Sequence, residues 1–196
     1  MAGIILAGGL STRLGRDKAF VRLNSETLLE MVISTLKNVV KQIIIVANEP
    51  EKFEHFVSSH TRVIQDKVPY QGPLGGILAG LEASPDFHNL VSSCDTPFLR
   101  KELCHYLLSQ ADDFDVVVPT IDSRIEPLPA VYSKNCSMFA RESLEKKTFR
   151  IISFFPKVKV KSIETDILRG YDPELVSFLN VNTEEDLKKA KEIYRR

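Results

Sequence analysis

Short runs of apolar residues alternate in this chain with segments whose apolar residues recur every three or four positions. The runs 4–7 and 43–46 are apolar throughout, as expected of strands buried on both faces of a sheet. Between them lies a stripe with helical spacing, formed by Leu28, Leu29, Val32, Ile33, Leu36 and Val40. This alternation predicts an α/β fold of three layers, with a mostly parallel, mixed sheet and helices on both faces.

The same patterns continue to the end of the chain. Further strands are expected at 62–66, 89–94, 115–119 and 158–162, and an antiparallel strand at 128–132. Helices are expected at 73–83, 100–111 and 134–146, with a short one at 149–155. Thr183 should cap a last helix, because Asp186 can complete a capping box. We expect one domain, spanning residues 1–196.

Charge and cysteine content exclude several classes of protein. The chain has 26 basic and 26 acidic residues, so no net charge attracts it to nucleic acid or to an anionic membrane. Its three cysteines are an odd number and form no C-x-x-C pair, so we expect buried free thiols in a reducing compartment rather than a disulfide framework or a zinc knuckle. There is no apolar stretch of about 20 residues, which a membrane span needs. These features predict a soluble, cytoplasmic protein.

The segment 6–18, with the sequence LAGGLSTRLGRDK, directly follows the first expected strand. Gly8 and Gly9 allow a ligand close to the backbone, and their N–H groups can converge on phosphate oxygens. Arg13 and Lys18 add positive charge that suits a polyphosphate. The alternative is an ordinary glycine turn with two solvated cations. A position at the carboxyl end of a strand, where open α/β sheets bind ligands, favours the phosphate site.

Asp95 follows the expected strand 89–94, in the sequence CDTP. A carboxylate at this edge of the sheet would face the Gly8 loop and could hold a divalent cation between phosphates. The alternative is that Asp95 only caps a helix starting near Phe98. Spacing alone favours capping at least as much as the metal site.

Two further polar or glycine-rich segments lie near expected helix starts. The segment 72–76 (GPLGG) could let a base or ribose pack against backbone, or could simply allow a tight helix–sheet contact. Asn182, in the sequence NVNT, could approach a metal or a ligand hydroxyl, although an isolated asparagine is more often a turn residue. Asp66 ends a strand, which many aspartates do.

Taken together, LAGG with Arg13, Gly15, Asp17 and Lys18, then GPLGG, CDTP and NVNT, resemble the molybdenum cofactor guanylyltransferases. The resemblance covers nearly the whole chain and implies a Rossmann-like nucleotidyltransferase fold. It also implies a reaction, the transfer of GMP from GTP to molybdenum-bound molybdopterin with release of pyrophosphate. Residues 1–100 would bind the nucleotide and residues 101–196 the acceptor. Transient contact with other cofactor biosynthesis proteins is implied as well.

The resemblance assigns roles to individual positions. Leu6, Ala7 and Gly8 would line the GTP site, Lys18 and Arg13 would contact its phosphates, and Asp66 and Asn48 would lie on the nucleotide side. Asp95 would bind GTP and ligate Mg²⁺. We therefore expect the catalytic residues to be Asp95, Lys18 and Arg13. Arg150 resembles a basic position that could hold the acceptor, and Pro129 departs from the usual acceptor-side pattern.

Other readings remain open. A molybdopterin cytidylyltransferase or a sugar-1-phosphate nucleotidyltransferase would keep the fold, but the former typically has AAG in the first loop and GDQP at the metal. A protein that binds GTP without turning it over is a reading of another class. A Rossmann dehydrogenase is disfavoured, because the fingerprint G-x-G-x-x-G is absent.

Overall fold

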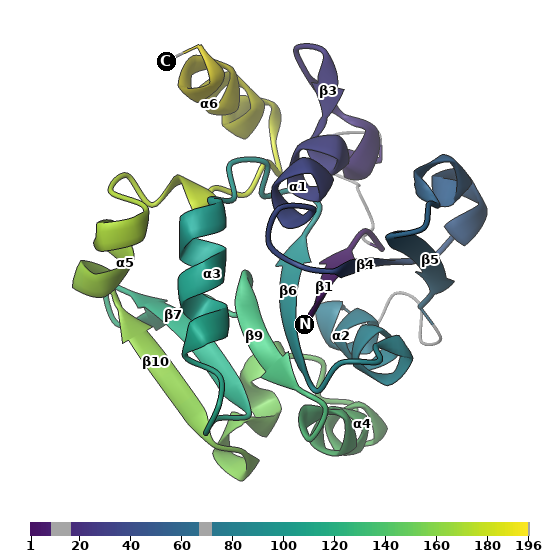
Figure 1. Cartoon of the computed structure of the whole chain (residues 1–196), viewed down its shortest axis with the longest axis vertical. Coiled ribbons are helices and arrows are strands. Elements are labelled where there is room, and N and C mark those ends of the chain that lie inside the picture. Colours follow the sequence, from purple (N-terminus) through teal and green to yellow (C-terminus); the bar gives the residue numbers. More distant parts are fainter. Residues whose placement is uncertain (9–16, 67–71, 196) are drawn as a thin grey trace.

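One mixed sheet runs through the structure, a computed structural model that describes residues 1–8, 17–66 and 72–195 (Figure 1). Its strand order is β10-β7-β9-β6-β1-β4-β5, with β8 paired to β7. The strands are β1 (Ala2–Leu6), β4 (Gln42–Ala47), β5 (Thr61–Gln65), β6 (His88–Ser93), β7 (Val116–Ile121), β8 (Arg124–Ile125), β9 (Ala130–Ser133) and β10 (Val160–Glu164). A small hairpin, β2 (Arg22–Leu23) with β3 (Glu26–Thr27), lies apart from the sheet.

Helices connect the strands. The α-helices are α1 (Leu28–Leu36), α2 (Pro73–Ala83), α3 (Lys101–Ser109), α4 (Cys136–Glu145), α5 (Thr165–Tyr171) and α6 (Glu184–Tyr194). The 3₁₀ helices are η1 (Lys18–Phe20), η2 (Pro50–Phe56), η3 (Ile151–Lys157) and η4 (Val176–Phe178). None of the helices in the described residues is long and apolar enough to cross a membrane.

The strand directions agree with the expected fold class. β1 pairs in parallel with β4 and β6, β4 with β5, and β7 with β10. Only β9, of the strands in the main order, is antiparallel to its neighbours β6 and β7. The antiparallel strand predicted at 128–132 is thus confirmed, shifted toward its carboxyl end. The prediction of a mostly parallel, mixed sheet is confirmed as well.

Alternate residues of the same strands enter two cores, one on each face of the sheet. The first core contains Ile5, Ile43 and Ile45 together with side chains of α1, α3 and α5. The second contains Ile4 and Ile44 together with side chains of α2, α4 and η3. The strands are apolar at successive positions because each face is covered by helices.

Several predicted elements have different bounds. The helix predicted from the stripe at 28–40 ends at Leu36, and residues 37–39 form a turn. The short helix predicted at 149–155 is a 3₁₀ helix displaced to Ile151–Lys157. The other 3₁₀ helices, the β2–β3 hairpin, β8 and α5 were not predicted, because segments this short show no clear hydrophobic period. The Thr183–Asp186 capping box is present as predicted.

The amino-terminal hairpin and the last helix meet in a third, smaller core. Val21, Leu23 and Leu28 pack there against Val181, Leu187 and Ala190. Figure 1 shows α6 beside β3 and α1, at the end of the molecule where β1 and β6 finish. The final segment of the chain is therefore carried back to the carboxyl edge of the sheet.

Candidate functional site

The carboxyl ends of β1, β4 and β6 meet at one edge of the sheet. The parallel ladder continues one residue beyond them, since Ala7 N–H donates to Val46 O at 2.8 Å and Cys94 N–H donates to Leu6 O at 3.1 Å. The residues that follow these strands, among them Gly8, Asn48 and Asp95, are thereby brought side by side. This is the edge at which open α/β sheets bind ligands.

Lys18, Asp95 and Asn182 form one polar cluster at this edge. Lys18 Nζ lies 3.4 Å from Asp95 Oδ2 and donates a hydrogen bond to Asn182 Oδ1. The Lys18 side chain is 23% exposed and the Asp95 side chain 12%, so both are shielded yet reachable from solvent. Three segments far apart in the sequence thus converge on one ammonium group.

Asp95 does not cap the helix that follows it. The residue before α3 is Arg100, and no side chain caps this helix. The loop is instead fixed from two sides. Thr96 Oγ1 donates to Ser93 O at 2.9 Å, and Val181 N–H donates to Asp95 O at 2.9 Å. The capping alternative left open by the sequence is therefore wrong.

One carboxylate oxygen of Asp95 has no hydrogen-bond donor among the described residues. Oδ2 faces Lys18, whereas Oδ1 is buried and accepts no hydrogen bond from the described residues. A buried carboxylate oxygen without a donor is unfavourable unless a cation or another donor reaches it. Its chemistry suits a hard cation such as Mg²⁺, which uses one or two protein carboxylates and takes its other ligands from phosphates and water. The described residues contain no cluster of three His, Cys, Asp or Glu that could hold a metal alone.

Gly8 and Asn48 form a close pair beside this cluster. A Cβ at position 8 would lie 3.0 Å from Asn48 Oδ1 and 3.3 Å from the Asn48 backbone nitrogen. Asn48 Oδ1 is buried and has no hydrogen-bond donor among the described residues. Only glycine fits at position 8 without displacing Asn48, so the structure gives Gly8 a steric reason for its identity.

Asp66 and Gly76 lie together between the end of β5 and the first turn of α2. Asp66 is 4% exposed at the end of β5, and a Cβ on Gly76 would lie 3.6 Å from Asp66 Oδ2 and 3.1 Å from Leu6 Cδ2. Gly76 is therefore a tight helix–sheet contact, which was one of the two readings of the 72–76 segment. Gly72, with φ of 76°, adopts a backbone conformation that glycine favours.

Arg150, which the sequence resemblance marks as a basic position that could hold the acceptor, has an exposed side chain and directly precedes η3. Its neighbour Phe149 approaches the start of α2, since a Cβ on Gly72 would lie 3.7 Å from Phe149 O. The segment around Phe149 thus lies next to the start of α2. Gly9 and Arg13, both predicted as site residues, lie outside the described residues.

Asp17 is a site-forming residue for which no separate role was predicted. It is the amino-terminal cap of η1, where its Oδ1 accepts the Ala19 N–H at 3.1 Å. Burial raises the pKa of this carboxyl group, although the hydrogen bond from Ala19 works in the opposite direction. The turn that presents Lys18 is thus fixed by its own neighbour. The sequence offered a signal for this cap, because an aspartate directly before a short helix is a common amino-terminal cap.

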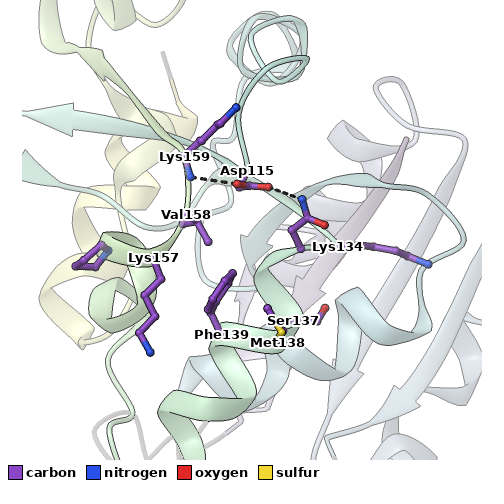
Figure 2. A pocket seen from close by; sticks show the side chains of 10 residues that line it. Asp115, Lys134, Ser137, Met138, Phe139, Lys157, Val158 and Lys159 are labelled. Carbon is purple, nitrogen blue, oxygen red and sulfur yellow. Dashed lines mark hydrogen bonds between the residues drawn. The ribbon is translucent and has the colours of Figure 1, made fainter.

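A groove of about 880 Å³ lies at the opposite edge of the sheet, where β7 and β10 begin (Figure 2). It is lined by residues of α4 and η3, and Asp115 accepts hydrogen bonds there from the backbone of Lys159 and the side chain of Asn135. Parallel strands place amino and carboxyl ends at opposite edges, so this groove is remote from Asp95. It does not belong to the candidate site.

A mixed α/β sheet with Gly8, Lys18 and Asp95 at its carboxyl edge fits the class of nucleotidyltransferases, and a comparison with known families agrees. The model of the MobA-like NTP transferase domain matches residues 3–154. The chain therefore belongs to the family of MobA-like NTP transferases. The resemblance predicted from the sequence is confirmed.

Individual proteins similar to this chain support the same family assignment. A protein of Desulfosudis oleivorans named molybdenum cofactor guanylyltransferase is 38% identical, over 97% of this chain and 94% of its own length. The crystal structure of molybdopterin-guanine dinucleotide biosynthesis protein A from Archaeoglobus fulgidus superposes with a TM-score of 0.87 at 28% identity, covering 100% of this chain and 99% of that one. The 4-diphosphocytidyl-2C-methyl-D-erythritol synthase of Anaerococcus prevotii, at 17% identity and a TM-score of 0.74, shares the fold.

Proposed function

We propose that this chain transfers GMP from GTP to the terminal phosphate of molybdenum-bound molybdopterin, giving a guanine dinucleotide cofactor and pyrophosphate. The names of its relatives support this substrate pair. The observation that carries the proposal is the convergence of Asp95 and Asn182 on Lys18, with the second carboxylate oxygen of Asp95 buried without a donor from the described residues.

The reaction needs no covalent intermediate on the protein. An oxygen of the acceptor phosphate forms a bond to the α-phosphorus of GTP as the bond from that phosphorus to the β-phosphate oxygen breaks, and the departing pyrophosphate takes the negative charge. The protein contributes position and fixed positive charge. Lys18 neutralises charge on the leaving group, together with Arg13, and the backbone N–H groups of Gly8 and Gly9 orient it.

Asp95 is the residue that would hold Mg²⁺, which when bound would offset the charge of the phosphates. Leu6, Ala7, Asn48 and Asp66 lie on the nucleoside side in this proposal. The burial of Asp66 beside the first turn of α2 supports its place in this proposal, because it puts the carboxylate at the sheet edge that carries the candidate site. Acceptor binding is assigned to residues 101–196, with Arg150 as one contact, while residues 1–100 bind GTP.

The test is a direct synthesis. Purified protein is incubated with Mg²⁺, molybdenum-bound molybdopterin and each nucleoside triphosphate in turn, and the products are separated by mass. We expect a guanine dinucleotide from GTP, with one pyrophosphate released per product. A cytosine dinucleotide would identify a cytidylyltransferase instead. Binding of GTP without release of pyrophosphate would leave a non-catalytic GTP-binding protein, and turnover with a sugar 1-phosphate would point to that class of transferase.

Location and partners belong to the same proposal. The three cysteines are buried free thiols, which supports a reducing, cytoplasmic compartment. An enzyme that receives a bound cofactor precursor must contact the protein that delivers it, so we expect transient contacts with other cofactor biosynthesis proteins. Nucleic acid and membrane are not expected as partners.

A further inference from the structure

Two segments far apart in the sequence run side by side behind the candidate site. The aspartate loop, residues 94–100, connects β6 to α3, and the return segment, residues 172–182, connects α5 to α6. They touch at the site itself, where Val181 N–H donates to Asp95 O at 2.9 Å. Each contributes one side chain to Lys18, Asp95 from the loop and Asn182 from the return segment. The relative position of the two segments therefore sets the geometry of the cluster.

Asp172 fixes that relative position at the other end. Its side chain is 0% exposed, and its two oxygens accept from both segments. Oδ1 accepts from Arg100 Nε at 3.1 Å, and Oδ2 accepts from the backbone N–H of Ser177 at 2.7 Å. A buried carboxylate persists only when its charge is compensated by a cation and its oxygens by donors, and both conditions are met here.

Ser177 also connects the return segment to the aspartate loop, through hydrogen bonds. Its Oγ accepts the backbone N–H of Arg100 at 3.0 Å, and its hydroxyl lies 3.5 Å from Phe98 O. Ser177 is itself 0% exposed. Asp172 and Ser177 thus join the return segment to the end of the aspartate loop, by both side-chain and backbone groups.

We propose that Asp172 is a positioning residue for nucleotidyl transfer, which acts by holding the return segment against the aspartate loop so that Asp95 and Asn182 meet at Lys18. The inference rests on the function proposed above for Asp95 and Lys18. A carboxylate is required because both partners are donors. In Asp172→Asn one donor would face an amide NH₂ group, so one of the two links is lost.

A purely structural clamp would stabilise the fold without affecting chemistry, so the test needs a matched control. Asp115 provides one at the opposite edge of the sheet. Its carboxylate also accepts a backbone N–H across two segments, that of Lys159 at 3.1 Å, and two side-chain donors, Ser133 and Asn135. Asp115→Asn should loosen the junction of β7 and β10 and leave the candidate site unchanged.

The experiment compares wild type with Asp172→Asn, Ser177→Ala and Asp115→Asn. For each we would measure Tm, kcat, KM for GTP, the Mg²⁺ concentration that gives half-maximal turnover, and amide hydrogen exchange of residues 176–182. Groups that orient a metal ligand typically change metal affinity or activity about 10- to 100-fold when mutated. We expect Asp172→Asn to lower kcat by that factor, to raise the Mg²⁺ requirement and to accelerate exchange at Val181. Ser177→Ala should shift the same quantities less.

Asp115→Asn should lower Tm with kcat within about twofold of wild type and unchanged exchange at Val181. The inference is overturned if Asp172→Asn, assayed where it is folded, keeps wild-type kcat and Mg²⁺ requirement. Should Asp172→Asn fail to fold, wild-type kinetics and exchange in Ser177→Ala overturn it equally. A wild-type protein that releases no pyrophosphate would instead overturn the proposed function, and the positioning role with it.

Discussion

At the scale of single residues, Asp95 combines two different environments in one carboxylate. Oδ2 lies 3.4 Å from the Lys18 ammonium, and Oδ1 has no donor among the described residues. The first contact holds the side chain in place, and the second leaves an acceptor for a cation. This division explains how one aspartate can be both anchored and available.

Asp95→Asn tests this assignment. The amide keeps the size of the side chain and removes the charge that Oδ1 would offer to a cation. We expect Mg²⁺-dependent pyrophosphate release to fall by about 10²-fold or more, the range typical for loss of one strong electrostatic stabiliser. The control is Asp113→Asn, an exposed carboxylate between α3 and β7, which should turn over as wild type does. Near wild-type turnover in Asp95→Asn would remove Asp95 from the mechanism.

Gly8→Ala tests the glycine turn. The new Cβ would lie 3.0 Å from Asn48 Oδ1 and 3.3 Å from Asn48 N, so Asn48 or the backbone at position 8 must move by a few tenths of an ångström. Small displacements of positioning groups can be costly for catalysis, and we expect kcat/KM for GTP to fall at least about 10-fold. Tm should change little, because Gly8 is only half-buried. Unchanged kcat/KM would show that position 8 does not approach the nucleotide.

The sequence was sufficient for the residues of the candidate site that sit in short, recognisable motifs. Gly8 and Asp95 come just after strands, whereas Asn182 lies in NVNT directly before the capped helix α6, in a stretch that forms no strand. Asp172 was not predictable, because its partner Arg100 is 72 residues away and neither residue belongs to a periodic pattern. A contact between two irregular segments depends on the tertiary fold, which spacing alone does not reveal.

At the scale of elements, α2 lies so close to β1 that the helix has room only for glycine where the two touch. A Cβ on Gly80 would lie 2.5 Å from Ile4 Cγ2 and 3.0 Å from Ile4 Cδ1. Gly76 makes the corresponding close contact with Leu6, one helical turn earlier. The glycines of α2 therefore let this helix lie against the strand that leads into the candidate site.

Gly80→Ala measures the closeness of that contact. Overpacking a core costs about 1–3 kcal/mol, and we expect the free energy of unfolding in urea to fall by that amount. The added methyl group should be tolerated when Ile4 is truncated, so the double variant Gly80→Ala, Ile4→Ala should be less destabilised than the sum of the single variants. The control Gly170→Ala, in α5, meets nothing within 4 Å and should be neutral or stabilising by about 0.5–1 kcal/mol. If the double variant were destabilised by the sum of the two single variants, the close contact between Gly80 and Ile4 would be contradicted.

The predictability of the elements followed their length and regularity. The strand at 43–46 and the cap at Thr183 were predicted because each carries a strong local signal, continuous apolar residues in one case and a capping box in the other. η1, which presents Lys18, spans only Lys18–Phe20 and is fixed by Asp17. Three residues cannot show a period, so its existence could not be inferred from the pattern.

At the scale of the whole molecule, the two cores are coupled because they share the strands of one sheet. Ile4 and Ile5 are neighbours in β1, yet each belongs to a different core. A strand cannot be released from one core and stay packed in the other without exposing apolar surface. The two helical layers should therefore unfold together.

The cysteines report on this coupling, since Cys104 lies in the α3 layer and Cys136 in the α4 layer. Both are 0% exposed, and burial raises the pKa of each thiol to about 12. Because the thiolate is the reactive form and both side chains are buried, neither cysteine should be alkylated at an appreciable rate in the folded state. Alkylation in increasing urea, with each cysteine quantified by mass spectrometry, would measure the opening free energy of each layer. We expect the two values to agree within about 0.5 kcal/mol, as for one cooperative transition. If Cys136 were labelled at clearly lower urea than Cys104, the α4 layer would open separately, and the shared sheet would not couple the two cores.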